Sequence, residues 1–371
     1  MAKAADVLVV GAGVVGCSVA YHLARMGLKG VLVLDRGEVG GEASGAAAGM
    51  LAPQCEAPGP GPFLDFCLAA RRYYERLAPE LKDLTRIDIE YLDWGILYLL
   101  DEEGDEAAEG RRRWQTELGL PVERLTREEV WKLEPGLTRQ IGGALLFPGD
   151  HHVNNSELIR ALAQAARSLG VRILEGCPVK GFVSEADRVA GVRTSDEIYV
   201  AARTVLCAGA WSGQLGALLG RRIPVEPARG QLVSGEVPEL PLRHPVWGKG
   251  GYLVPRLNGS VIVGSTVEYV GFDRTVTLEG IRRLSELALT LLPGLGALPF
   301  TRAWAGLRPH CKDELPLIGP LTDLDGLSIA TGHFRNGILL GPLTGRLVAE
   351  MILEEPLSFP LDAFSPKRLG L

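Results

Sequence analysis

The fold is decided by VLVVGAGVVG, residues 7–16, an apolar run that ends in a glycine loop. A continuous apolar run of this kind is typical of a parallel strand buried on both faces. The loop matches G-x-G-x-x-G: Gly11 allows a tight turn, Gly13 lets the backbone approach a pyrophosphate, and Gly16 lets the following helix sit close to the sheet. The pattern predicts a helix over 14–26, which Gly27 ends.

A second buried strand is predicted over 31–34, and it ends at Asp35. A carboxylate there accepts hydrogen bonds from an adenosine ribose and repels a 2′-phosphate, which excludes NADP. A tight turn without a ligand is the plain alternative, but strand, loop, helix and terminal acid together make it a poor one. These residues predict an adenine dinucleotide and leave NAD and FAD both open.

The remaining chain predicts an α/β protein whose Rossmann-like dinucleotide domain is discontinuous in sequence. Its pieces are expected at 1–86, 146–220 and 320–371. A mainly antiparallel β (α+β) substrate domain is expected at 87–145 and 221–319. Helices are predicted over 63–84, 101–118, 156–170 (with Ser156 as N-cap), 278–292 and 337–354. Strands are predicted within 88–100 and over 171–174, 179–183, 189–194, 198–200, 204–207, 231–235, 252–255, 261–264 and 327–331.

Composition excludes several classes of function. A net charge of −6 with dispersed basic residues argues against a nucleic-acid partner. Six scattered cysteines without metal spacing predict no metal site, and they suit a reducing cytoplasm better than secretion. The longest apolar stretch, 337–353, is interrupted by Pro342, Arg346 and Glu350, so no membrane span is expected. We therefore expect a soluble, cytoplasmic protein without a signal peptide.

Three further segments carry a resemblance to a known family. They are GEASGAAAGML at 41–51, AGAWS at 208–212 and ATGHFRNGILL at 330–340. In order and spacing they resemble the D-amino-acid oxidase-like family of FAD enzymes over essentially the whole chain. Within it the chain is most similar to the glycine oxidases of thiamine biosynthesis, through YLVPR (252–256), WAGLRP (304–309) and 332–340. The resemblance implies FAD as the cofactor; a close helix–helix contact is the plain alternative for 43–51.

The resemblance also implies which residues bind the cofactor. Small residues let the backbone pass close to the flavin, Ser44 donates to a phosphate, and the helix beginning at Gly337 points its positive end at the flavin pyrimidine. The expected cofactor-binding residues are Gly11, Gly13, Val14, Val15, Gly16, Asp35, Arg36, Ala43, Ser44, Ala48, Gly49, Met50, Val179, Gly209, His333, Phe334, Arg335, Asn336, Gly337, Ile338 and Leu339.

Substrate binding is implied for a smaller set. Arg308 grips a substrate carboxylate in a bidentate way and Tyr252 adds a hydroxyl donor. Spacing alone does not choose Arg308 over Arg302 or Arg256. The expected catalytic residues are Tyr252, Arg308 and Arg335, and Met50 and Val267 complete the substrate pocket. Valine at 267, where the family pattern has methionine, puts strict glycine preference in doubt.

The function implied is FAD-dependent oxidative deamination of a small amino acid or amine: glycine, or else sarcosine or D-alanine. Hydride passes to flavin N5 and oxygen is reduced to hydrogen peroxide. The glycine imine would feed thiamine thiazole synthesis. A D-amino-acid or proline dehydrogenase with another electron acceptor, and a non-catalytic dinucleotide-binding module, are the alternatives.

The same resemblance also bears on flavin attachment and on oligomeric state. Cys311 does not coincide with the cysteine that attaches flavin in related sarcosine oxidases, so non-covalent FAD is expected. The resemblance allows a homotetramer, but the sequence does not fix the oligomeric state. Neither the sequence nor the resemblance assigns a role to His310.

Overall fold

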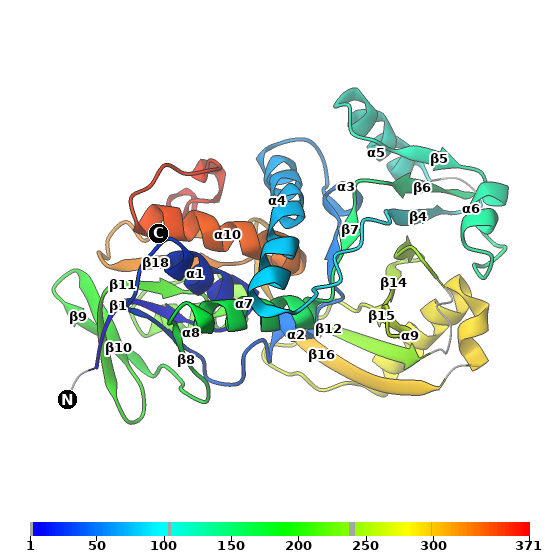
Figure 1. The fold of residues 1–371 in the computed structure, drawn as a ribbon. Coiled ribbons are helices and arrows are strands. Elements are labelled where there is room, and N and C mark those ends of the chain that lie inside the picture. Colours follow the sequence, from blue (N-terminus) through cyan, green and yellow to red (C-terminus); the bar gives the residue numbers. More distant parts are fainter. Residues whose placement is uncertain (1–2, 103–104, 237–241, 298) are drawn as a thin grey trace.

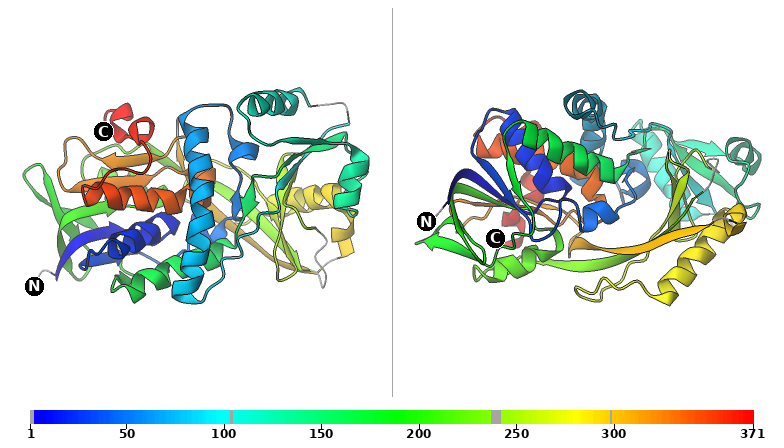
Figure 2. Two further views of the ribbon diagram at one scale, coloured as in Figure 1. Left: turned by 45° about the horizontal axis from the view of Figure 1, so that its top comes forward. Right: turned by 60° about the horizontal axis from the view of Figure 1, so that its bottom comes forward.

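The chain folds into two lobes, each built around its own sheet. A computed structural model describes residues 3–102, 105–236, 242–297 and 299–371. One lobe carries both termini and the glycine loop, and the long helix α4 (Pro62–Thr85) stands where the lobes meet (Figures 1 and 2). In the described part of the chain, no helix is long and apolar enough to cross a membrane.

The first sheet has the strand order β17-β18-β11-β1-β2-β8, with β10 attached to β11 and β9 attached to β10. β1 pairs in parallel with both β2 and β11, while β17 runs antiparallel at one edge. This mixed α/β sheet confirms the predicted fold class. Its strands are β1 (Lys3–Val10), β2 (Val31–Leu34), β8 (Arg172–Leu174), β9 (Gly181–Glu185), β10 (Arg188–Arg193), β11 (Ile198–Leu206), β17 (Leu317–Pro320) and β18 (Leu327–Thr331).

Alternate residues of β1 enter two different cores. Val7 and Val9 pack with the helices α1 (Val14–Arg25), α4, α7 (Asn155–Ser168) and α10 (Gly337–Ile352). Leu8 and Val10 pack on the other face with residues of β10, β11 and β17. Burial on both faces explains why the strand reads as an unbroken apolar run.

The second sheet has the order β16-β12-β15-β14-β13-β4-β6-β5. Adjacent strands are antiparallel except β13 and β4. Two long strands, β12 and β16, extend from the centre of the molecule (Figure 1). The strands are β4 (Ile96–Leu100), β5 (Glu123–Leu125), β6 (Gly143–Phe147), β12 (Val225–Glu236), β13 (Val246–Gly248), β14 (Gly251–Pro255), β15 (Ser260–Gly264) and β16 (Phe300–Cys311).

The helices of this lobe lie at its outer end, and short elements join the lobes. The outer helices are α5 (Glu106–Glu117), α6 (Arg127–Leu133) and α9 (Leu278–Leu291). The remaining elements are α2 (Ala43–Ala46), β3 (Met50–Leu51), α3 (Pro53–Glu56), β7 (His151–His152) and α8 (Ser212–Ala217). Apart from the two-stranded pair β3–β7, the strands thus separate into two sheets, and we propose that the predicted division into two domains follows this separation.

Several local predictions were wrong. The N-cap of α7 is Asn154, whose side chain accepts from the Glu157 N–H, because the helix begins at 155 and Ser156 already lies inside it. The strand expected within 88–100 covers only Ile96–Leu100. The runs 198–200 and 204–207 belong to one strand, β11, since the residues between them, 201–203, also pair with β1.

Candidate active site

The glycine loop is packed so tightly that only glycine fits at its two ends. Gly11 has φ +109°, and a Cβ on it would lie 2.4 Å from the Cys207 carbonyl oxygen. A Cβ on Gly16 would lie 1.9 Å from the Gly11 oxygen. The loop therefore brings α1 against the sheet at the carboxyl ends of β1 and β11, where open α/β sheets bind ligands.

The beginning of α1 can receive an anion, with Ser44 placed beside its first N–H group. Its N-cap, Gly13, has no side chain to bond the first turn. The Val14 N–H donates to Ser44 Oγ at 3.0 Å, so the Ser44 hydroxyl proton remains available for a phosphate. Asp35 accepts from the Ala12 N–H at 2.6 Å and from the Gly37 N–H at 2.8 Å. These bonds fix its carboxylate at the cavity wall.

A cavity of about 500 Å³ begins at this loop and continues to the second sheet. This volume is in the range of small-molecule and cofactor sites. It is lined by most of the residues expected at the site: Gly11, Gly13, Val14, Val15, Asp35, Arg36, Ala43, Ser44, Ala48, Gly49, Met50, Val179, Gly209, Tyr252, Arg308, His333, Phe334, Arg335, Gly337 and Ile338.

Four expected residues lie elsewhere. Gly16 packs beneath the loop, and Leu339 is buried in the helical core. Asn336 is the N-cap of α10 and is not among the residues that line the cavity, although Arg335 and Gly337 on either side of it are. Val267 is 42% exposed and is not among the residues that line the cavity, although Ser265, two residues earlier, is. The structure therefore gives no place in the cavity wall to the valine on which the doubt about glycine preference rested.

The segment 43–51 crosses the cavity and is fastened from the second lobe. Trp304 Nε1 donates to the Ala46 carbonyl at 3.0 Å, and a Cβ on Gly306 would lie 2.6 Å from that of Ala46. Arg256 donates to the Ala48 carbonyl at 2.9 Å. Burial lowers the pKa of Arg256 to about 10, so it stays charged at neutral pH. Arg256 is thus a structural clamp, and it does not line the cavity.

A second helix N-terminus faces the same cavity. α10 begins at Gly337, and its N-cap Asn336 makes no side-chain capping bond. Just before it, Phe334 has φ +45°, an unfavourable conformation for a residue with a side chain. Burial lowers the pKa of His333 to about 3, and its Nε2 lies 3.0 Å from Thr344 Oγ1. His333 is therefore neutral and buttresses this turn.

Arg308 lies on β16 at the other end of the cavity. Its guanidinium donates to the Thr266 carbonyl at 3.2 Å and to Ser265 Oγ at 2.6 Å, which leaves other N–H groups free to bind a carboxylate. On β12 a Cβ at Gly230 would lie 2.2 Å from the Arg308 Nη atoms. A Cβ at Gly264 would meet the Tyr252 ring at 2.5 Å. The two glycines make room for the two side chains.

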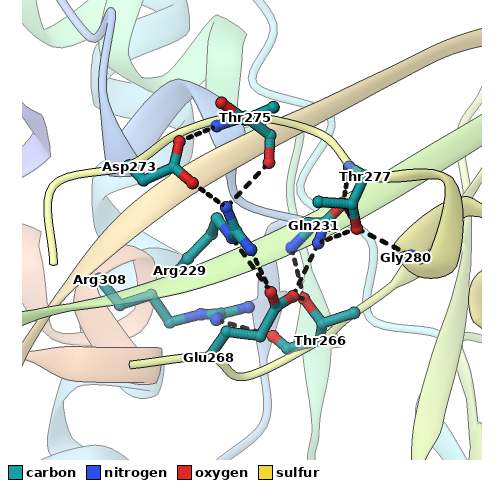
Figure 3. A network of polar contacts seen from close by, with 9 residues as sticks. All are labelled: Arg229, Gln231, Thr266, Glu268, Asp273, Thr275, Thr277, Gly280 and Arg308. Carbon is teal, nitrogen blue, oxygen red and sulfur yellow. Dashed lines mark hydrogen bonds and ion pairs between the residues drawn. The ribbon is translucent and has the colours of Figure 1, made fainter. Parts of the chain in front are cut away.

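A polar network holds the loop that carries Ser265 and Thr266 (Figure 3). Glu268 is its centre: it accepts from Thr266 Oγ1 at 2.5 Å, from Gln231 Nε2 at 2.8 Å and from the Arg229 guanidinium. Arg229 also donates to Asp273 at 2.7 Å. Burial raises the pKa of Glu268, but the hydrogen bonds from Thr266, Arg229 and Gln231 outweigh it and leave the pKa below its usual value.

Arg335 lies at this end of the cavity too, but it is already paired. Its Nε donates to Glu56 Oε2 at 3.0 Å, and its guanidinium lies 5.2 Å from the centre of the Trp247 ring. Glu56 raises the pKa of Arg335, and this attraction outweighs the effect of burial.

Sequence reasoning missed several residues that line the cavity. Glu56, Ser265 and Gly230 show no local motif, since each becomes meaningful only beside Arg335 or Arg308. Trp211 was quoted in the 208–212 segment without a role, and the Arg36 guanidinium lies 3.7 Å from its ring centre. Cys311 is fully buried opposite Val225 and lies outside the lining. His310 packs between the rings of Tyr269 and Phe334.

Two uncapped helix ends, a ribose-type carboxylate and a run of small residues are what a flavin dinucleotide needs, and together they define a dinucleotide-dependent redox enzyme. The family model described as FAD dependent oxidoreductase matches residues 6–351, and the chain belongs to this family. The cofactor of the family is FAD, and the residues that line the cavity fit it.

Individual relatives agree with this assignment. Glycine oxidase of Bacillus licheniformis is 38% identical over 99% of this chain and 98% of its own length. The bifunctional protein ThiO/ThiG of Nostoc sp. is 39% identical over 94% of this chain, which spans 53% of that longer protein. The crystal structure of glycine oxidase from Geobacillus kaustophilus superposes with a TM-score of 0.94 at 34% identity, covering 98% of each chain.

Proposed function

We propose that the protein oxidises the C–N bond of glycine or a similarly small amine to an imine. The observation that carries this proposal is the position of Arg308 and Tyr252 at one end of a cavity whose other end is the dinucleotide loop. FAD supplies the two-electron acceptor when it is bound, and oxygen then takes the electrons to give hydrogen peroxide. The relatives that are glycine oxidases support the choice of substrate.

The protein's own residues bind and orient the substrate. Arg308, held by Ser265 and Thr266, grips the carboxylate as a fork, and the Tyr252 hydroxyl donates to the same group. This contact fixes the α-carbon relative to the helix N-termini at the cofactor end. Met50 closes the pocket above the small α-substituent. No side chain needs to form a covalent bond with the substrate.

The experiment is an anaerobic titration of the flavin-loaded protein with glycine, sarcosine, D-alanine and D-proline. We expect bleaching of the flavin absorbance by glycine, followed by one hydrogen peroxide per flavin when oxygen is admitted. Failure of all four amines to bleach the flavin would overturn the proposal. Bleaching without peroxide, with transfer to a dye instead, would favour the dehydrogenase.

Four finer points belong to the same proposal. The FAD is non-covalent, which the burial of Cys311 away from the cavity supports; flavin left in the pellet after acid precipitation would contradict it. The imine feeds thiazole formation in thiamine synthesis, as the bifunctional relative suggests. The protein works in the cytoplasm, in keeping with six free thiols. A homotetramer is the oligomer to test, by light scattering.

A further inference from the structure

The substrate end of the cavity contains two guanidinium groups, of Arg308 and Arg335, and one carboxylate, of Glu56. The two arginines differ in their partners. Arg308 is held by neutral oxygens of Ser265 and Thr266 and keeps its full charge for a substrate. Arg335 is bound by Glu56 through a hydrogen bond of 3.0 Å between charged groups. The carboxylate and the guanidinium are 11% and 29% exposed, so water screens this pair only in part.

Glu56 is held in place from behind. It ends the short helix α3, whose first N–H groups, of Gln54 and Cys55, donate to the buried Asp150 at 3.1 and 2.8 Å. Arg111 donates to the Cys55 carbonyl at 2.5 Å. These bonds fix the backbone that carries Glu56. The side chain is oriented by its ion pair with Arg335, so the carboxylate occupies that guanidinium in the structure.

The charges of Arg308, Arg335 and Glu56 limit how many carboxylates a substrate can carry. One substrate carboxylate on Arg308 meets a free cation. A second carboxylate on the same substrate would approach Arg335 and also Glu56, and two carboxylates close together at one site repel each other strongly. Rejection by such a like charge is a common route to specificity.

We propose that Glu56 is a specificity residue: by occupying Arg335, it restricts the site to amines with one carboxylate and excludes amines with two. The excluded class comprises N-carboxymethyl amino acids, such as iminodiacetate, and short acidic amino acids, such as D-aspartate. This inference rests on the proposed amine oxidation, because the same C–N bond is oxidised in both substrate classes and only the second carboxylate differs.

The test is the variant Glu56→Gln, which keeps the shape and one acceptor oxygen but removes the charge. We expect the ratio of kcat/KM for iminodiacetate to that for glycine to rise about 10- to 100-fold, as for relief of a like-charge contact worth about 1.4–2.8 kcal/mol. Binding is followed separately by the change in flavin absorbance with malonate and with acetate, which do not react. The affinity for malonate, relative to that for acetate, should increase in Glu56→Gln.

Two further variants make the test specific. In the double variant Glu56→Gln/Arg335→Met the gain for iminodiacetate and malonate should disappear, because the second guanidinium, which would bind the second carboxylate, has been removed. Glu80→Gln is the matched control: Glu80 accepts from Arg25 Nε at 2.9 Å but lies outside the cavity lining, and its loss should leave the ratio unchanged.

The outcomes separate this inference from the proposed function. If the wild type oxidises glycine and Glu56→Gln leaves both ratios unchanged, Glu56 does not set specificity. A loss of glycine affinity with no gain for iminodiacetate or malonate would also overturn the inference, since it would make Glu56 a partner of the substrate amine. If the wild type oxidises no amine, the proposed function fails, and malonate binding still decides the role of Glu56.

Discussion

The two ends of the cavity differ in the groups that form them: mainly backbone at one end and mainly side chains at the other. The dinucleotide end is made of backbone: two glycines in enforced positions, two uncapped helix N-termini and a run of small residues. The substrate end is made of charged and polar side chains, such as Arg308, Arg335 and Glu56, that come from distant segments of the chain. A backbone site tolerates almost no substitution, whereas a side-chain site can be altered one charge at a time. The predictions below test this difference.

The largest effect is expected from Gly11→Ala. The new Cβ would meet the Cys207 carbonyl at 2.4 Å in a backbone conformation with φ +109°, and the combined clash and strain should cost about 3 kcal/mol or more. We expect loss of bound flavin, measured as the ratio of absorbance at 450 to 280 nm, and a lower melting temperature. Gly27→Ala is the control, because Gly27 has φ +100° but no atom within 4 Å of an added Cβ. It should cost only about 1–2 kcal/mol and keep its flavin.

Arg308→Met, at the substrate end, should retain its flavin but bind substrate much more weakly. Removing one partner of a buried charged contact costs about 2–5 kcal/mol, which is a rise of roughly 30- to 4,000-fold in the Kd for glycine. The Kd of Arg308→Lys for glycine should lie between those of the wild type and Arg308→Met, since an ammonium group keeps the charge but cannot make the bidentate contact of a guanidinium. Anaerobic flavin-reduction kinetics give Kd directly. Loss of flavin from Arg308→Met would show that the two ends are not independent.

This division also explains what the sequence could reveal. The helix predicted over 14–26 is found at Val14–Arg25, and the strand at 31–34 is found as predicted, because a glycine loop and two-sided burial are local signals. Glu56 and Ser265 carry no such signal: their meaning depends on Arg335 and Arg308, which lie 279 and 43 residues away along the chain. Arg308 itself was identified by resemblance, and spacing left it equal to Arg302 and Arg256.

Glu268→Gln should weaken substrate binding from a distance. Glu268 bonds Thr266, whose carbonyl accepts from Arg308, so the variant should raise the Kd for glycine roughly fivefold, about 1 kcal/mol, with flavin content unchanged. Asp273→Asn is the matched control (Figure 3). It also bonds Arg229 but does not touch Thr266, and glycine binding should be unaffected. Equal effects of both variants would contradict a role in positioning Arg308.

The same carboxylate should give a pH-dependent contribution to stability. Because the pKa of Glu268 is lowered in the folded protein, its contribution is present above the unfolded pKa of about 4.3 and is lost as pH falls through the folded pKa. The difference in unfolding free energy between wild type and Glu268→Gln should therefore shrink below about pH 4. Urea unfolding at pH 7 and at acid pH measures it, and a difference that grows on acidification would contradict this sign.

The smallest effect is expected from Ser44→Ala, at the backbone end. Ser44 accepts from the Val14 N–H and can donate a hydrogen bond to a phosphate, so its loss should cost about 0.5–1 kcal/mol of FAD binding, a two- to fivefold rise in Kd. Ser18→Ala, on α1 itself, is the control: Ser18 donates to the Pro342 carbonyl at 3.0 Å in the core, and its loss should lower stability without changing FAD affinity. The effect of Ser44→Ala should stay small because the backbone N–H groups of α1 remain in place. A complete loss of FAD would instead mean that one side chain, and not the backbone, holds the phosphates.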